Sequence, residues 1–148
     1  MIVFLSCIVA KKYFIVHGGL SPELIDIAEL KTINRFCEIP IDGIIALNLF
    51  SDILWSDPVD DDLGECDPIF KENPTRGSSF MFGKDAVKVF LKKNKLISII
   101  RGHECMLEGY KFHKWDKNSD FPLVITIFSA PNYCDTYKNK GSIIKFEV

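Results

Sequence analysis

Two histidines occupy equivalent positions in the sequence, each directly after an apolar run and next to glycine. His17 follows residues 13–16 and precedes two glycines, and His103 follows residues 96–100 and Gly102. Short runs rich in β-branched residues predict buried strands. Neutral imidazoles are common ligands of zinc, iron and related metals. Two strand-end histidines together therefore suggest a metal site, whereas one alone would more often be a hydrogen-bonded structural residue.

A third apolar run, residues 123–128, also ends in a polar loop, which contains Pro131 and Tyr133. Ligand sites of α/β proteins lie beyond the carboxyl ends of the strands, so we expect the three loops to converge on one site. Tyr133 offers a phenol hydroxyl for hydrogen bonding, with an aromatic ring packed at the strand end as the alternative. His113, in a run of mixed polarity at residues 110–115, is expected to be structural or exposed.

Arg76 and Asp57 are the other polar candidates. Arg76 stands beside a glycine, and a planar guanidinium there suits bidentate binding of a phosphate or carboxylate. Taken alone, however, Arg76 is more simply interpreted as a surface arginine. Asp57 could contribute a carboxylate ligand, or it could cap a turn before Pro58.

Strands and helices alternate in the part of the chain that must position these residues. Residues 1–16 predict two neighbouring strands joined at Lys11 and Lys12, and residues 142–148 predict a final strand after a hairpin turn at 138–141. Ser21, followed by proline and glutamate, is a helix-start signal.

The clearest helix is predicted over residues 84–94, where an apolar face alternates with lysines. The lysines concentrate late in the helix, where they favour the carboxyl end of its dipole. We interpret them as a solvated face rather than as a phosphate-binding patch.

The composition narrows the functional classes. The chain has 148 residues, 47% of them hydrophobic, which suits one domain with a real core, and its net charge of -2 argues against a nucleic-acid partner. Five scattered cysteines with no C-x-x-C pair fit reduced thiols in the cytoplasm or nucleus. Residues 1–10 are apolar but lack a positive leader region, and they are far shorter than the roughly 20 residues that span a bilayer. No membrane partner is expected.

Five segments of the chain are specific when they are considered together. They are, in order, residues 16–22 (Val-His-Gly-Gly-Leu-Ser-Pro), 54–58 (Leu-Trp-Ser-Asp-Pro), 76–83 (Arg-Gly-Ser-Ser-Phe-Met-Phe-Gly), 101–104 (Arg-Gly-His-Glu) and 128–134 (Phe-Ser-Ala-Pro-Asn-Tyr-Cys). The set resembles the carboxyl-terminal half of the catalytic domain of the phosphoprotein phosphatase family of serine/threonine phosphatases. The segments at 121–127 and 135–140 are most similar to the calcineurin branch.

This resemblance implies an α/β fold, the calcineurin-like metallophosphoesterase β-sandwich flanked by helices, of which only the carboxyl-terminal half is present. It also implies hydrolysis of phosphomonoesters by water activated between two divalent metal ions, Fe/Zn or Mn. By motif position, His17 and His103 would bind one metal and Arg76 would hold phosphate oxygens. Tyr133 would line the site and hydrogen-bond the phosphate or a metal-bound water. The substrate groove would include three further residues: Trp55, Asp57 and Cys134.

The family's amino-terminal motifs, Gly-Asp-x-His-Gly, Gly-Asp-x-x-Asp-Arg-Gly and Gly-Asn-His-Glu, do not occur here. They would supply the remaining metal ligands, the general acid and a second phosphate-binding arginine. We therefore expect residues 1–148 to be one partial catalytic domain with at most a partial single-metal site, poorly soluble and nearly inactive alone. Gly102 stands where alanine is usual, a change expected to be harmless.

The implied partners are phosphoserine- and phosphothreonine-containing proteins, with a regulatory subunit as a further candidate. One alternative is a non-catalytic half-domain that binds a protein partner through the retained substrate-docking surface. Another is a non-catalytic metal-binding module that uses His17 and His103 in trans within a dimer.

Overall fold

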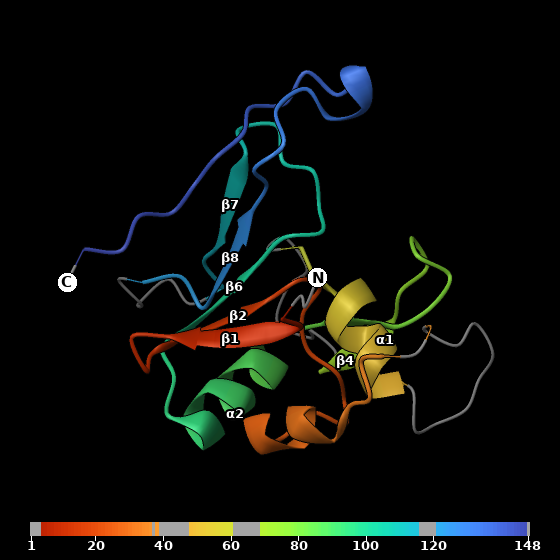
Figure 1. The fold of residues 1–148 in the computed structure, drawn as a ribbon, viewed down its shortest axis with the longest axis vertical. Helices are drawn as coiled ribbons and strands as arrows, with labels where there is room; N and C mark the ends of the chain where they lie inside the picture. The colour runs from red at the N-terminus through yellow and green to blue at the C-terminus, as the bar shows by residue number, and fades with distance from the viewer. Residues whose placement is uncertain (1–3, 37, 39–47, 61–68, 116–120, 148) are drawn as a thin grey trace.

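A five-stranded mixed sheet forms the centre of the fold (Figure 1). The computed structural model describes residues 4–36, 38, 48–60, 69–115 and 121–147. The strands lie in the order β1 (Ser6–Val9), β2 (Tyr13–Val16), β6 (Ser98–Arg101), β8 (Val124–Ile127) and β7 (Tyr110–His113).

The three central strands, β2, β6 and β8, are parallel, and the two outer pairings are antiparallel. Val16 pairs with Arg101, and Arg101 pairs with Thr126, so the carboxyl ends of these strands lie at one edge of the sheet. The predicted convergence of the three strand-end loops is therefore confirmed.

A second, smaller sheet supports the segment that carries Arg76. It has the order β3 (Asp57–Pro58), β5 (Phe80–Phe82) and β4 (Phe70–Glu72), with β3 parallel and β4 antiparallel to β5. Phe82 is fully buried. The backbone between β4 and β5 turns back on itself, because the N–H of Asn73 donates to Ser79 O (3.1 Å) and that of Gly77 donates to Asn73 O (3.0 Å).

Helices in the described part of the chain pack against the large sheet and complete the core. Helix α2 (Lys84–Asn94) has the predicted bounds and buries four apolar side chains, Ala86, Val87, Phe90 and Leu91. The Phe90 ring packs 5.1 Å from the ring of Phe14 on β2, so α2 covers one face of the large sheet. Helix α1 (Asn48–Trp55) buries Phe50 and Ile53 in the same core. No helix in the described ranges is both long and apolar enough to cross a membrane.

The predicted helix start at Ser21 is wrong. The helix here is a 3-10 turn, η1 (Ile27–Thr32), and Asp26 caps it by accepting a bond from the N–H of Ala28 (2.9 Å). The hydroxyl of Ser21 instead donates to the buried carboxylate of Asp52 (2.7 Å). The same hydroxyl accepts from the N–H of Glu23 (3.2 Å), and the N–H of Leu24 donates to Ser21 O (3.1 Å), so Ser21 closes a single turn that does not continue as a helix.

The predicted final strand is also absent, since residues 142–147 have no regular structure. Ile143 is 87% exposed, so the segment buries too little apolar surface to offset the entropy of ordering it. Residues 138–141, where the hairpin turn was expected, instead hydrogen-bond to the loop that follows β8 and hold it in place. The Asn139 side chain accepts from the N–H of Tyr133 and donates to Ala130 O, both at 2.8 Å.

His113 is structural, as one of the two expectations had it. Its ring is buried at the end of β7, and its Nε2 lies 3.0 Å from the hydroxyl of Thr126 on β8. Its pKa is lowered to about 3, mainly by burial and further by the nearby positive charges of Lys111 and Arg101. The ring is therefore neutral at ordinary pH.

Candidate active site

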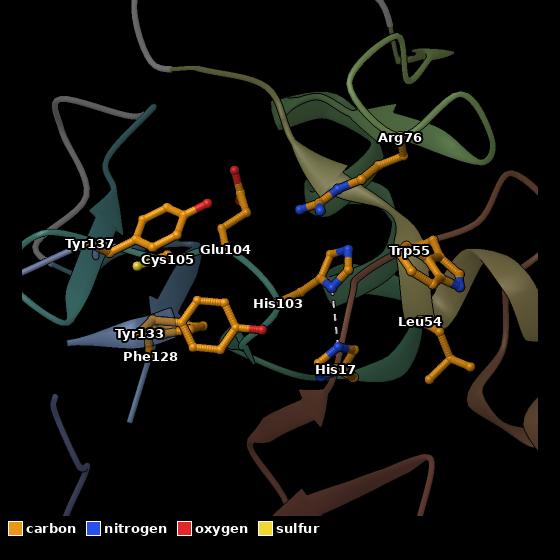
Figure 2. A pocket seen from close by; sticks show the side chains of 10 residues that line it. All are labelled: His17, Leu54, Trp55, Arg76, His103, Glu104, Cys105, Phe128, Tyr133 and Tyr137. Carbon is orange, nitrogen blue, oxygen red and sulfur yellow. Dashed lines mark hydrogen bonds between the residues drawn. The ribbon is translucent and has the colours of Figure 1, made fainter. Parts of the chain in front are cut away.

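His17 and His103 meet, although 86 positions separate them in the sequence. Nε2 of His17 lies 3.1 Å from Nδ1 of His103 (Figure 2). The two rings are held close because β2 and β6 are neighbours and the N–H of Gly102 donates to His17 O (3.0 Å). Loops that follow adjacent parallel strands thus bring both imidazoles to one point.

A tight turn after β6 directs the His103 ring. His103 has a φ of 66°, in the left-handed region, and the N–H of Glu104 donates to Gly102 O (2.8 Å). A left-handed conformation costs a non-glycine residue about 1–2 kcal/mol, so the surrounding structure must hold it. The Trp55 ring packs edge-on against His103 with centroids 5.2 Å apart.

Both imidazoles are neutral at physiological pH. Burial lowers the pKa of His103 to about 4, and the positive charge of Arg76 adds to this effect. Burial also lowers the pKa of His17, helped by Arg101 and Arg76. Neutral imidazole is the form that binds metal ions.

Arg76 is held beside the pair by a buried carboxylate. Its Nε donates to Asp57 Oδ2 (2.9 Å), and Asn73 Nδ2 donates to the same oxygen (2.9 Å). Burial works to raise the pKa of the Asp57 carboxyl, but the bonds from Arg76 and Asn73 and the charge of Arg101 outweigh it and lower the pKa. Asp57 is therefore ionised, with its oxygens committed to cations and an amide rather than open to a metal.

Arg101 is a central residue that the sequence analysis did not assign. Its side chain is fully buried, and its Nε donates to Gly18 O (2.5 Å). Its Nη2 donates to Ser56 O (3.1 Å) and Asp57 Oδ1 (2.8 Å), and its Nη1 donates to Glu104 Oε2 (2.6 Å). One guanidinium thus joins the loops after β2, α1 and β6. A charge placed directly at the end of an apolar run was the available signal.

These residues surround a cavity of about 640 Å³ (Figure 2). Its lining comprises His17, Leu54, Trp55, Arg76, His103, Glu104, Cys105, Phe128, Tyr133 and Tyr137. The ring of Tyr133 stands edge-on to Phe128 (5.1 Å between centroids) and 5.8 Å from Tyr137, which gives the cavity an aromatic wall opposite Arg76. In such a cavity Arg76 can bind an anionic group, and the aromatic rings can pack against the molecule that bears this group.

Five of the seven predicted site residues line this cavity, and two do not. Asp57 lies buried behind Arg76 and supports it. Cys134 is exposed on the 3-10 turn η3 (Tyr133–Asp135) with a φ of 54°. Sequence reasoning missed Glu104 and Tyr137 as lining residues, although both follow predicted ones closely.

The residues present fit a metal ion in part. Two ligands about 2.1 Å from one cation lie about 3 Å apart when they subtend a right angle, close to the 3.1 Å between the histidine nitrogens. In the part of the chain that is described, Nε2 of His103 is buried without a hydrogen-bond partner. Across the same part, however, no three His, Cys, Asp or Glu side chains gather to hold a metal.

Comparison with known proteins decides the family. The family model described as calcineurin-like phosphoesterase matches residues 2–107. The chain belongs to the calcineurin-like phosphoesterase family. The predicted resemblance and the predicted fold class are thereby confirmed, and members of this metallophosphoesterase family generally require divalent metal ions.

Relatives of this calcineurin-like phosphoesterase are serine/threonine phosphatases. It is 43% identical to serine/threonine-protein phosphatase 2B catalytic subunit A1 of Saccharomyces cerevisiae, over 97% of this chain and 26% of that protein. It is 38% identical to the phosphatase 4 catalytic subunit of the same yeast, over 97% of this chain and 41% of that one. The calcineurin branch stays a prediction, because phosphatase 2B catalytic subunit A2 of the same yeast is also 38% identical, no more than phosphatase 4.

A solved structure agrees with this placement. It is a Saccharomyces cerevisiae protein serine/threonine phosphatase described as similar to human phosphatase PP5, and it matches with a TM-score of 0.69 and 34% identity. The match covers 93% of this chain and 38% of that one. The chain thus spans between about a quarter and two fifths of the length of these relatives.

Proposed function

We propose that this chain forms part of the active site of a metal-dependent phosphatase that removes phosphate from phosphoserine and phosphothreonine in proteins. In this proposal His17 and His103 hold one divalent metal ion, Arg76 binds the phosphate oxygens, and Tyr133 and Trp55 form the walls. Residues 1–148 act as one partial domain, and the isolated chain hydrolyses phosphate esters little or not at all.

The observation that carries the proposal is the 3.1 Å contact between the His17 and His103 rings beside Arg76 in one cavity. Surface histidines and a surface arginine would have no reason to meet across so much sequence. Metal ligands and an anion-binding guanidinium have to meet there.

Each side chain has a task that follows from its setting. Asp57 orients Arg76 by accepting from its Nε (2.9 Å) and its Nη2 (3.4 Å), and a guanidinium held in this way suits binding of phosphate oxygens. The aromatic rings of Trp55 and Tyr133 line the cavity and offer flat surfaces to the substrate. When bound, divalent cations supply the Lewis acidity and the activation of water that phosphate ester hydrolysis needs.

The low activity proposed for the isolated chain follows from the ligand set. Two imidazoles leave a metal ion short of the four or more ligands that such ions take. The same proposal includes Fe/Zn or Mn as the metal ions and phosphoserine- and phosphothreonine-containing proteins as the substrates. A regulatory subunit is a further proposed partner. A reducing compartment, cytoplasm or nucleus, is supported by the free thiols of Cys7, Cys105 and Cys134.

Metal binding tests the site without relying on turnover. Titration of Mn²⁺ into the purified chain, followed by the electron paramagnetic resonance of free Mn²⁺, should give one site. His17→Gln and His103→Gln should each weaken it at least tenfold, whereas His113→Gln, with folding checked by circular dichroism, should not. Equal affinity in all four proteins would contradict the metal assignment.

Phosphate binding and turnover test the rest. The wild-type chain should broaden the ³¹P resonance of inorganic phosphate, and added vanadate should reverse this broadening by competition. Arg76→Gln should abolish the broadening, and Arg35→Gln should leave it unchanged. Efficient turnover of a phosphopeptide by the isolated chain with Mn²⁺ would refute the proposed inactivity. A stable protein partner, bound equally by Arg76→Ala and His103→Ala, would favour the non-catalytic binding alternative.

A further inference from the structure

A basic surface lies at the end of the large sheet opposite the histidine pair. Lys11 and Lys12 lie in the turn between β1 and β2, and Lys92, Lys93 and Lys95 lie at the end of α2 (Figure 1). All five side chains are exposed. We call these five residues the lysine face.

The two segments of the lysine face are joined by the backbone. The N–H of Ile97 donates to Lys12 O (2.9 Å), and Tyr13 pairs with Ser98 in the register of β2 and β6. The turn and the helix end are therefore fixed next to each other, and their charges add.

Local structure explains only part of this concentration of charge. Lys92 and Lys93 sit in the last turn of α2, where cations stabilise the helix dipole. That reason does not apply to Lys11 or Lys12. Within the described residues, none of the five forms an ion pair with a carboxylate, although the whole chain carries a net charge of -2.

Two of these lysines occupy backbone positions that suit glycine better. Lys11 has a φ of 57° and Lys95 a φ of 56°, and Lys95 is the left-handed residue that ends α2, where glycine is usual. A lysine there costs backbone strain that glycine would avoid.

The apolar neighbours of the lysine face define the partner. Val89 on α2 is 64% exposed and Ile97 is 43% exposed, and both are small, β-branched side chains. The five lysines bring no planar guanidinium to bind phosphate in a fork. Tyr13, next to Lys12, packs its ring against those of Phe121 and Phe146.

We propose that the lysine face is a docking surface for an acidic segment of a protein partner, in which carboxylates meet the lysines and aliphatic side chains meet Val89 and Ile97. Docking there leaves the cavity open, because the lysine face precedes β2 and follows α2, while the histidines follow β2 and β6. The proposal stands independently of the phosphatase assignment.

Fluorescence anisotropy tests the docking with a labelled peptide of about twelve residues that alternates Glu or Asp with Leu. Lys11→Glu/Lys12→Glu/Lys95→Glu should weaken binding at least tenfold. The matched control, Lys114→Glu/Lys138→Glu/Lys140→Glu, makes the same change in net charge at exposed lysines elsewhere and should weaken binding less than threefold. Affinity should also fall as salt rises, because exposed charges are screened over about 8 Å at physiological ionic strength.

Three results would overturn the proposal. The first is equal weakening by the control, which would make the effect one of net charge alone. The second is no binding of the peptide at millimolar concentration. The third is tighter binding of phosphatidylserine vesicles or of a single-stranded oligonucleotide through the same lysines, which would assign the surface to another class of partner. Circular dichroism melts of both triple variants, and a second set with glutamine in place of glutamate, guard against loss of folding.

Discussion

Replacing Asp57 with asparagine should destabilise the fold far more than the small change in shape suggests. The carboxylate lies between two guanidinium groups, 2.8 Å from Nη2 of Arg101 and 2.9 Å from Nε of Arg76. The Arg101 side chain is 0% exposed and that of Asp57 is 5% exposed. In Asp57→Asn the two cations face each other with only Glu104 to balance them.

The size of the effect follows from the burial of the pair. Two unit charges about 4 Å apart interact by about 4 kcal/mol at an effective dielectric constant of about 20. Removing one partner of a buried ion pair costs about 3–5 kcal/mol. Because the asparagine oxygen still accepts a hydrogen bond, we expect a loss of about 3 kcal/mol in the free energy of unfolding. For a chain of this length that lowers the melting temperature by about 6–12 °C.

Urea unfolding followed by far-UV circular dichroism measures this loss. Lys145→Gln is the matched control, because the Lys145–Glu147 pair has the same 2.8 Å separation but its side chains are 78% and 79% exposed. Exposed pairs contribute little, so the control midpoint should not move measurably. If Asp57→Asn shifted the midpoint no more than the control does, water would have to screen the guanidinium groups, and the argument that this network supports the site would fail.

Three further predictions concern other parts of the fold. The folded-state pKa of His113, about 3, is below its unfolded value of 6.5, so its contribution to stability is complete above pH 6.5 and falls as the pH is lowered. Between pH 7 and pH 5 we expect the free energy of unfolding to fall by about 2 kcal/mol. Urea midpoints measured against pH should therefore fall more steeply for wild type than for His113→Gln. Gly102→Ala should leave the thermal midpoint unchanged, since a Cβ there meets nothing closer than 3.6 Å. Gly18→Ala should lower the midpoint sharply, because its Cβ would lie 2.5 Å from the Leu54 backbone carbon. Asn94→Ala should cost about 1–3 kcal/mol in urea, because the side chain accepts from one backbone N–H of the η1 segment and donates to two carbonyls; an unchanged midpoint would show that water replaces these bonds.

The sequence predicted best where all the information is local. The bounds of α2 follow from its own apolar periodicity and its late lysines, and the structure agrees with them to the residue. The helix start at Ser21 failed although its hydroxyl accepts from the N–H of Glu23, because the chain makes only a single turn there and the next helical turn is capped by Asp26. The Ser21 hydroxyl also donates to Asp52, 31 residues away, a contact that no local pattern contains.

Some features of the candidate site could likewise be predicted from the sequence, and others could not. The meeting of His17 and His103 could be predicted from a general rule about the ends of parallel strands, with no knowledge of the contacts. Arg101 could not be assigned, because its acceptors lie between 3 and 83 residues away, and their positions depend on the complete fold. Asp57 was placed in the substrate groove from its position in a family motif, and its bonds to two arginines are not visible in the sequence.

The parallel register of β2 and β6 has a consequence for how this protein can vary over evolution. Side chains alternate between the faces of a strand, so deleting one residue from β2 or β6 would turn a histidine ring to the far side of the sheet. Lengthening the surface segments between Leu20 and Leu96 would leave both rings where they are. We expect homologous sequences to differ freely in the length of those connections, while the two strands keep a constant number of residues.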